Sequence, residues 1–381
     1  IDPSAFAQFS LTANGTLSYQ TRIDANNLNA DFRVEVYFTD DGADAPAPNS
    51  NRSVTQTFAI NVTPVNDQPS FELPQTRVDV IEDAQNSGLP RGATVIPGFA
   101  TDIQRGPASA TDEFSQVLNP FEIVSMVGQE KFSVLPAIDT ATGNLTFTTA
   151  ENANGLAVVV MRLTDQGASS PAPNDNISEL QTFTIAIAPI NDAPQFTIPT
   201  TITVDEDAGS ISRPGFATGV RRGPVGSDDE NSQLINFSVR ALNTALFRTQ
   251  PAIGVDGTLT FETALNVNSA NAQLLVEVTL FDSGLDAPAP NVNHSDTRTF
   301  TITVNPVNDA PTTDAFTATT TEDTLTTIQS VDVLVGDKAG PTVDEFSQSL
   351  RMTQVQRTSL HGGVIVPNFD PLDASRIVCG S

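Results

Sequence analysis

Pro306-Val307-Asn308-Asp309-Ala310-Pro311 is the stretch that decides the fold, because two close copies of it occur earlier in the chain. The earlier copies are Pro64-Val65-Asn66-Asp67-Gln68-Pro69 and Pro189-Ile190-Asn191-Asp192-Ala193-Pro194. The copies lie about 120 residues apart, a spacing too long for one turn of a solenoid and typical of whole domains. Each copy follows an alternating apolar run such as Phe300-Thr301-Ile302-Thr303-Val304, where a final strand would leave its sheet. The sequence therefore predicts tandem domains joined by Asn-Asp linkers.

These linkers divide the 381 residues into four repeats. We expect residues 68–192 and 193–309 to be complete repeats, the second and the third. Residues 1–67 match the second half of a repeat, and residues 310–381 match the first half. The complete repeats share an ordered set of motifs: Glu-Asp, Pro-Gly-Phe-Ala-Thr, Gly-Pro, Asp-Glu-X-Ser-Gln, Pro-Ala-Ile, Gly-X-Leu-Thr-Phe and Pro-Ala-Pro-Asn.

Short strands separated by turn residues fill each repeat. About seven strands in ~120 residues, with no helical period, are typical of an antiparallel β-sandwich with Greek-key connections. The alternation in Phe-Thr-Ile-Thr-Val gives each strand one apolar face and one threonine-rich face. We therefore predict an all-β chain of tandem immunoglobulin-like sandwiches in an elongated array.

The net charge of the chain limits the classes of molecule that it could bind. Asp and Glu outnumber Lys and Arg by 45 to 18, giving a net charge of −27, which argues against nucleic acid or an anionic membrane surface. Divalent cations are natural counter-ions, although acidity can also simply keep an exported or halophilic protein soluble. No apolar run is long enough to span a membrane. The single cysteine, Cys379, fits an extracellular bacterial protein or a reduced cytosolic one.

The sequence offers no catalytic set. His294 and His361 are isolated, and the chain has no Gly-X-Ser-X-Gly motif, phosphate loop or zinc-ligand spacing. We therefore expect no enzymatic activity.

Carboxylates, in contrast, recur at equivalent places in every repeat. In a sandwich, the end of the first strand lies beside the exit linker, and the loops with Asp-Glu lie at the opposite end, against the preceding linker. Each junction would then gather many carboxylates, which is costly without a cation. Clustered oxygen ligands favour Ca²⁺ over transition metals and over Mg²⁺. The alternative is that Asn, Asp and Pro only build turns and the acids face water.

These motifs resemble the cadherin-type repeats, particularly the cadherin-like tandem repeats of large bacterial cell-surface proteins. The resemblance rests on the Asn-Asp-X-Pro linker, the Glu near the end of the first strand, and Ala100-Thr101-Asp102 followed by acidic residues. It extends over the whole chain and implies that calcium binds between the repeats.

The resemblance implies a ligand set for each junction. Between the first and second repeats the set is Asn66, Asp67, Asp102, Asp112, Glu113 and Asp165. Between the second and third repeats it is Glu82, Asp83, Asn191, Asp192, Asp229, Glu230 and Asp282. Between the third and fourth repeats it is Glu206, Asp207, Asn308, Asp309, Asp337, Asp344 and Glu345.

The chain also departs from the animal cadherins. Their acidic Asp-Arg-Glu motif is replaced by Glu151-Asn152-Ala153-Asn154 and by Asn266-Val267-Asn268, and Gly219 stands where the second repeat has Asp102. We therefore expect fewer calcium ions per junction, about one or two.

The predicted function is a calcium-rigidified extracellular stalk, or an adhesive, fibre-forming segment of a bacterial surface protein. Its partners would be neighbouring repeats, copies of the same chain, or a cell-surface or glycan ligand. The alternative is a carbohydrate-binding or spacer module attached to a separate extracellular enzyme or lectin domain. Two Tyr and no Trp give little material for an aromatic sugar platform, which favours the stalk.

Overall fold

The computed structural model describes residues 5–86, 88–270, 272–321, 327–329, 333–341, 344–352, 366–369 and 376–380. These residues form short strands joined by turns and short 3-10 helices, which confirms the predicted all-β class. The chain divides into two compact units: Ile1–Ile190 with Val225–Asp229, and Asn191–Pro224 with Glu230–Ser381. We call them the first and the second unit.

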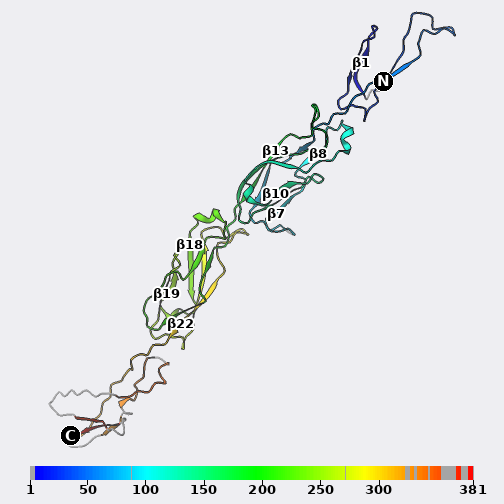
Figure 1. Cartoon of the computed structure of the whole chain (residues 1–381). Coiled ribbons are helices and arrows are strands. Elements are labelled where there is room, and N and C mark those ends of the chain that lie inside the picture. Colours follow the sequence, from blue (N-terminus) through cyan, green and yellow to red (C-terminus); the bar gives the residue numbers. More distant parts are fainter. Residues whose placement is uncertain are drawn as a thin grey trace. The chain divides into compact units, whose positions relative to one another are not determined.

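The second repeat, in the first unit, forms a two-sheet sandwich (Figure 1). Its elements are β5 (Ser70–Glu72), β6 (Arg77–Ile81), β7 (Ala93–Ile96), β8 (Thr101–Gln104), η1 (Thr111–Ser115), β9 (Glu122–Val127), η2 (Gln129–Lys131), β10 (Phe132–Ile138), β11 (Leu145–Thr149), β12 (Gly155–Arg162) and β13 (Gln181–Ala188). One sheet has the order β6-β13-β12-β9 and the other the order β10-β11-β7, while β5 pairs with β8.

The core of this repeat lies between its two sheets. Alternate residues of β12, including Val159, are buried, and Phe183 of β13 is 1% exposed. Phe183 meets Phe99 edge to face, with ring centroids 4.8 Å apart, and Phe147 of β11 joins the same cluster. Each such aromatic side chain contributes about 1.5–3 kcal/mol on burial. The alternating pattern in the sequence therefore becomes the inner faces of a sandwich.

The third repeat follows the same topology. Its elements are β14 (Gln195–Thr197), β15 (Thr201–Asp205), β16 (Ile211–Arg213), β17 (Thr218–Arg221), η3 (Asp228–Ser232), β18 (Ile235–Ala241), η4 (Thr244–Leu246), β19 (Phe247–Ile253), β20 (Leu259–Thr263), β21 (Leu274–Asp282) and β22 (Arg298–Asn305). The sheets have the orders β15-β22-β21-β18 and β16-β20-β19, and β14 pairs with β17. Alternate residues of β21 are again buried.

One feature of the sheets differs from a purely antiparallel sandwich. β6 pairs in parallel with β13, from Arg77 opposite Thr184 to Ile81 opposite Ala188, and β15 pairs in parallel with β22. The first long strand and the last strand of each complete repeat therefore run in the same direction. The other strand pairs of these repeats are antiparallel, as predicted.

The first repeat has a small core. It contains β1 (Phe6–Leu11), β2 (Leu17–Thr21), β3 (Arg33–Val36) and β4 (Gln56–Ala59), which form two antiparallel pairs. Its core is built on Phe6, Phe32 and Val34. The described part of the fourth repeat includes β23 (Thr327–Gln329), β24 (Val366–Phe369) and β25 (Arg376–Gly380). Glu322 and Asp323, the Glu-Asp pair of this repeat, lie outside the described residues.

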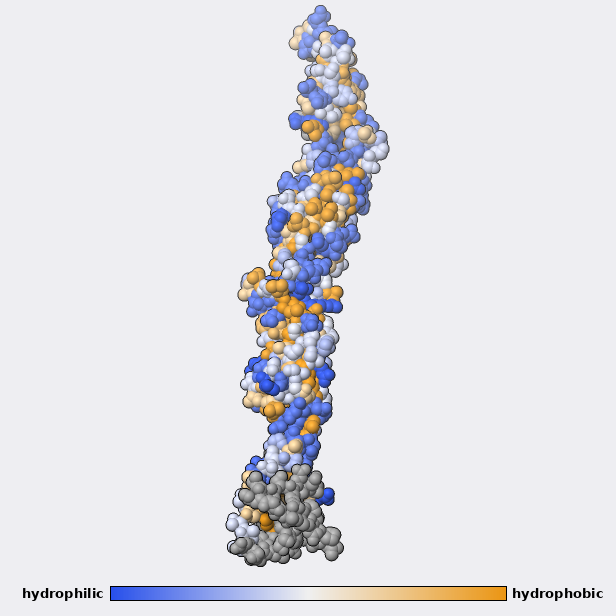
Figure 2. Space-filling model, turned by 90° about the vertical axis from the view of Figure 1, so that its left-hand side faces the viewer, coloured by the Kyte–Doolittle hydropathy of each residue, from blue (hydrophilic) through white to orange (hydrophobic). Residues whose placement is uncertain are grey.

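On the face shown in Figure 2, apolar side chains lie scattered among hydrophilic ones. Among the described residues, no helix is both long enough and apolar enough to cross a membrane.

Candidate metal centres at the linkers

Hydrogen bonds from both its backbone and its side chain hold the linker residue Asn66 in place. Its backbone N–H donates to Oδ1 of Asn174 at 2.9 Å. Its side-chain Nδ2 donates to the carbonyl oxygen of Asp175 at 2.7 Å and to Oδ1 of Asp165 at 3.3 Å. Its Oδ1 accepts from Nε2 of Gln116 at 2.7 Å. Asn174, the last residue of the Pro-Ala-Pro-Asn motif, therefore holds the linker against the second repeat.

The next residue, Asp67, is held through its backbone. Its N–H donates to Oε1 of Glu113 at 2.6 Å. Glu113 is 2% exposed and lies in η1, within the Asp-Glu-X-Ser-Gln motif. A Cβ on Gly106 would lie 1.8 Å from Oε2 of Glu113. The Gly-Pro motif therefore leaves room for the carboxylate that binds the linker.

This arrangement buries carboxylates close to one another. Burial, and to a smaller extent the charges of Asp67, Asp112 and Asp165, raise the pKa of Glu113 to about 7. Burial raises the pKa of Asp165, and it raises the pKa of Asp67 together with the charges of Asp24 and Asp112. The ionised cluster is therefore costly unless a cation compensates it.

Three buried oxygen atoms of this cluster have no hydrogen-bond partner among the described residues: Oε2 of Glu113, Oδ2 of Asp165 and Oε1 of Gln116. Buried polar atoms are nearly always satisfied, so orphaned oxygens grouped beside a linker point to a bound water or ion. Two carboxylate oxygens and one amide oxygen are hard ligands of the type that calcium takes. We call Asn66, Asp67, Glu113, Gln116 and Asp165 the first linker site.

The first repeat also contributes acids near this site. Asp24 accepts a hydrogen bond from Oγ of Ser109 and has a left-handed backbone, with φ 60°. Asn29 connects the two repeats, because its Nδ2 donates to Oδ1 of Asp112 at 3.1 Å and to the carbonyl oxygen of Asp24 at 2.7 Å. Asp102 lies exposed in β8, and the hydrogen bonds of the described residues do not connect its side chain to this linker.

The second unit repeats the arrangement. The N–H of Asn191 donates to Oδ1 of Asn291 at 2.8 Å, and its Nδ2 donates to Oδ1 of Asp282 at 3.1 Å. Nε2 of Gln233 donates to Oδ1 of Asn191 at 2.6 Å, and the N–H of Asp192 donates to Oε1 of Glu230. Oδ2 of Asp282 and Oε1 of Gln233 are buried without a hydrogen-bond partner. These five residues, Asn191, Asp192, Glu230, Gln233 and Asp282, form the second linker site.

A third cluster lies in the second unit, where Glu206, Asp207 and Asp309 place ligand atoms within 4.8 Å of one another. Glu206 is 3% exposed, and its Oε1 has no hydrogen-bond partner. Burial raises the pKa of Glu206, although the hydrogen bond from Asn268 lowers it in part, and the charges of Asp344, Asp309 and Asp207 raise it further. We call Glu206, Asp207 and Asp309 the third linker site.

The fourth repeat supplies the remaining residues predicted for this junction. The N–H of Asp309 donates to Oε1 of Glu345, and Oε2 of Glu345 is buried without a hydrogen-bond partner. Asp344 acts on the pKa of Glu206 and therefore lies nearby. Asp337 instead accepts from the N–H of Asp314 at 2.7 Å, and Asn308 is exposed. Asp337 thus has a local role within its own repeat.

Glu82 and Asp83, which follow β6, have different neighbours from the acids of the third linker site. Oε1 of Glu82 accepts from the N–H of Ile190 at 2.7 Å, so this Glu does lie beside the exit linker, as expected. Nδ2 of Asn154 donates to Oε2 of Glu82 at 3.2 Å and to Oδ1 of Asp229 at 2.8 Å. Asp83 forms an ion pair with Arg91 at 2.8 Å. We call Glu82 and Asp83 the Glu82 site; it belongs to the first unit.

Sequence reasoning missed several residues of these sites. Gln116 and Gln233 lie in the motif that was used only for its acids, and their recurrence in both complete repeats was the available signal. Asn174 and Asn291 end the two Pro-Ala-Pro-Asn motifs, and their side chains accept hydrogen bonds from the linker residues Asn66 and Asn191. Asp24 sits where Asn152 and Asn266 sit in later repeats, and all three have positive φ.

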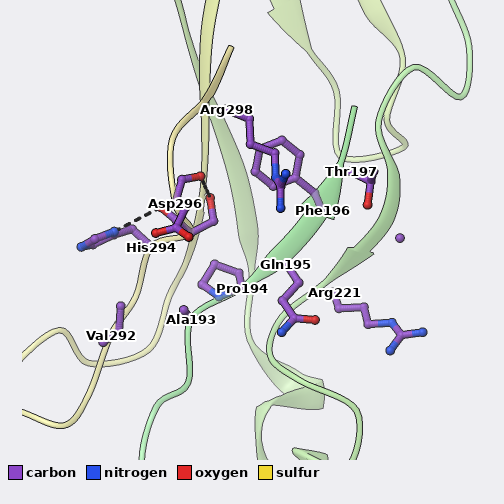
Figure 3. A pocket seen from close by; sticks show the side chains of 12 residues that line it. Ala193, Pro194, Gln195, Phe196, Thr197, Arg221, Val292, His294, Asp296 and Arg298 are labelled. Atoms are coloured by element: carbon purple, nitrogen blue, oxygen red, sulfur yellow. Dashed lines mark hydrogen bonds between the residues drawn. The ribbon is translucent and has the colours of Figure 1, made fainter. Parts of the chain in front are cut away.

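A pocket of the third repeat has a volume of about 650 Å³ and lies between β14, β17 and residues 292–298 (Figure 3). His294 and Arg221 line it, but their side chains extend in opposite directions, away from each other. A ring nitrogen of His294 lies 3.3 Å from the carbonyl oxygen of Ser295, and the ring packs on Phe281. The guanidinium of Arg298 lies over the ring of Phe196. His361 lies outside the described residues.

No model of a known protein family matches the chain, and no curated protein matches it. Similar solved structures are cadherins. Mouse cadherin-23 EC22–24 is 18% identical, with a TM-score of 0.38 over 80% of this chain and 83% of that chain. Mouse protocadherin-24 EC1–3 is 16% identical, with a TM-score of 0.37 over 80% of this chain and 88% of that chain. The fold class itself is established by the sheets of each repeat.

Proposed function

We propose that this chain is a calcium-stiffened stalk segment of an extracellular bacterial surface protein. The observation that carries the proposal is the repeated burial of carboxylates with orphaned oxygens beside the Asn-Asp linkers, in the first linker site and again in the third. Turn chemistry alone does not require a buried Glu whose second oxygen has no partner. A divalent cation would satisfy these oxygens and compensate the clustered charge.

The residues fit calcium by their chemistry. Glu113, Asp165 and Gln116 would supply oxygens at the first linker site, and Glu206, Asp207 and Asp309 would supply them at the third. When bound, the ion would supply positive charge and oxygen coordination where one repeat meets the linker. Glu113 accepts from the N–H of the linker residue Asp67, and Glu345 accepts from that of Asp309. The ion would therefore bind carboxylates that the fold already holds beside the linkers. Calcium would therefore stiffen the linker.

The carbohydrate-binding alternative needs an open aromatic face. Tyr37 carries the guanidinium of Arg52 over its ring at 3.5 Å, and Tyr19 packs edge-on against Phe6. These contacts favour the stalk over a sugar platform.

Titration calorimetry of the whole chain tests the proposal. We expect calcium to bind, magnesium to bind much more weakly, and Asp309→Asn to remove one ion from the total. Calcium at 100 times its dissociation constant should stabilise the folded chain by about 2.7 kcal/mol, so the midpoint of thermal unfolding should rise. Asp296→Asn, an exposed acid of the third repeat, is the matched control. The absence of calcium heat at millimolar concentrations, or full binding by Asp309→Asn, would contradict the proposal.

A further inference from the structure

The two Glu-Asp pairs that follow β6 and β15 are equivalent in sequence but have different neighbours. Asp83 and Asp207 both have left-handed backbones, with φ 52° and 55°. Each accepts a hydrogen bond from an Asn N–H: Asn152 donates to Asp83 at 3.3 Å, and Asn266 donates to Asp207 at 2.9 Å. The backbone cradle for the carboxylate is therefore the same in both repeats.

The two pairs differ because Asp83 has a basic side chain beside it. Nη2 of Arg91 lies 2.8 Å from Oδ2 of Asp83, and Nη1 lies 3.3 Å from Oε1 of Glu151. The Asp83 side chain is 3% exposed, whereas that of Arg91 is 46% exposed. A second cation is close, because Nζ of Lys131 donates to the carbonyl oxygen of Asn154 at 2.7 Å. The Asp83 carboxylate is thus neutralised by a side chain of its own repeat.

The third repeat has no equivalent of either cation. The segment between Glu-Asp and Pro-Gly-Phe-Ala-Thr spans residues 84–96 in the second repeat but only 208–213 in the third. The strand registers align Gly92 with Gly209, so the uncharged Ala208 stands at the position of Arg91. Leu246 ends η4 where Lys131 ends η2. Among the described residues, the ion pairs do not include Glu206, Asp207 or Asp309.

The backbone holds Arg91 in place. The following residue, Gly92, donates its N–H to the carbonyl oxygen of Ala84 at 2.9 Å and accepts from the N–H of Thr149 at 3.1 Å. Gly92 has φ 76°, and a Cβ there would lie 2.6 Å from Oγ1 of Thr149. The longer segment is therefore pinned between Ala84 and Thr149, which presents Arg91 to Asp83 rather than leaving it in a loose loop.

We propose that Arg91 is a tethered cation that takes the place of a metal ion at the Glu82 site, so that this site and the third linker site differ in their need for calcium. The inference rests on the proposed calcium function. Asp83 keeps a paired cation without calcium, whereas the third linker site depends on calcium for its positive charge. A unit positive charge about 4–5 Å from a divalent cation weakens the binding of that cation by about twentyfold, even at the dielectric constant of water. Arg91 therefore lowers calcium affinity at the Glu82 site.

The test is the number of calcium ions bound by the whole chain, measured by equilibrium dialysis and calorimetry. We expect Arg91→Gln to bind one more ion than the wild type at the concentration that saturates the stronger wild-type sites. The double variant Asp83→Asn/Arg91→Gln removes both charges and should return to the wild-type number, which also controls for loss of fold. Arg221→Gln removes an exposed arginine of the third repeat and should change nothing.

Each outcome separates the two proposals. If the wild type binds calcium and Arg91→Gln binds the same number with unchanged affinity, the role of Arg91 is wrong and the stalk proposal stands. If the wild type binds none and Arg91→Gln binds one, the role of Arg91 stands and the stalk proposal fails. If neither protein binds calcium, both fail. A gain by Arg221→Gln equal to that of Arg91→Gln would also overturn the inference, since net charge alone would then explain it.

Discussion

Replacing Glu113 with Gln should have opposite effects with and without calcium. The side chain keeps its size and the oxygen that accepts the N–H of Asp67, but it loses the charge. The pKa of Glu113 rises from 4.5 to about 7 in the folded chain. Because the folded chain raises the pKa of Glu113, the protonated carboxyl contributes to the stability of the folded chain. This contribution is complete below pH 4.5 and is lost as the pH rises through about 7.

The size of the effect follows from this shift. About 2.5 pKa units correspond to roughly 3 kcal/mol, which is what ionised Glu113 costs the calcium-free first unit at pH 8. In a chelator at pH 8, we therefore expect Glu113→Gln to exceed the wild type in stability by about 2–3 kcal/mol. At pH 4.5 the two proteins should differ little. In calcium the order should reverse, because the wild type alone keeps the full ligand set.

Urea unfolding followed by far-UV circular dichroism measures this, because the second repeat, which holds Glu113, contains neither Tyr nor Trp. Glu72→Gln, which removes an exposed carboxylate of the same repeat, is the control and should have little effect. A variant that gains no stability in chelator at pH 8 would refute the claim that the buried charge is costly. A variant that keeps the calcium-induced stabilisation of the wild type would show that Glu113 is not a ligand.

Two further predictions concern packing. Gly223→Ala should destabilise the second unit by about 1–3 kcal/mol in urea, because its Cβ would lie 1.5 Å from Oε2 of Glu230 and displace the acceptor of the Asp192 N–H. Gly209→Ala, which has φ 75° but nothing within 4 Å, should show only the backbone cost of about 1 kcal/mol, and an equal loss in both variants would count against the argument. Hydrogen exchange should be faster in β3 and β4 than in β12 and β13, because Phe58 is 39% exposed where Phe183 is 1% exposed. Equal protection in a monomer would contradict this expectation.

The sequence predicted the strands well, because alternation records which side of a strand is buried. Phe300-Thr301-Ile302-Thr303-Val304 lies in β22, and its Phe, Ile and Val are the buried residues. Alternation does not record the neighbouring strand, so the parallel pairing of β6 with β13 was not foreseen.

The candidate sites were predictable where the same acid recurred in each repeat. Glu113 was placed beside Asp67 on that basis, and the hydrogen bond between them agrees with it. Arg91 could not be found in this way, because Ala208 stands at its position in the third repeat. Asn66 was expected as a ligand from the resemblance to cadherin-type repeats, but a sequence motif does not show that Gln116 already donates to its oxygen. Side-chain partners of this kind depend on the folded geometry.

The parallel pairing of β6 with β13 has a mechanical consequence. Tension on the two ends of the second repeat reaches this pair at the start of β6 and at the end of β13, which are opposite ends of the paired region. The pull then acts along the strands in shear, and the evenly spaced hydrogen bonds between Arg77–Ile81 and Thr184–Ala188 resist it together. An antiparallel hairpin pulled at its open end would instead unzip one bond at a time. The same geometry recurs in β15 and β22, so each complete repeat carries its own shear-loaded strand pair.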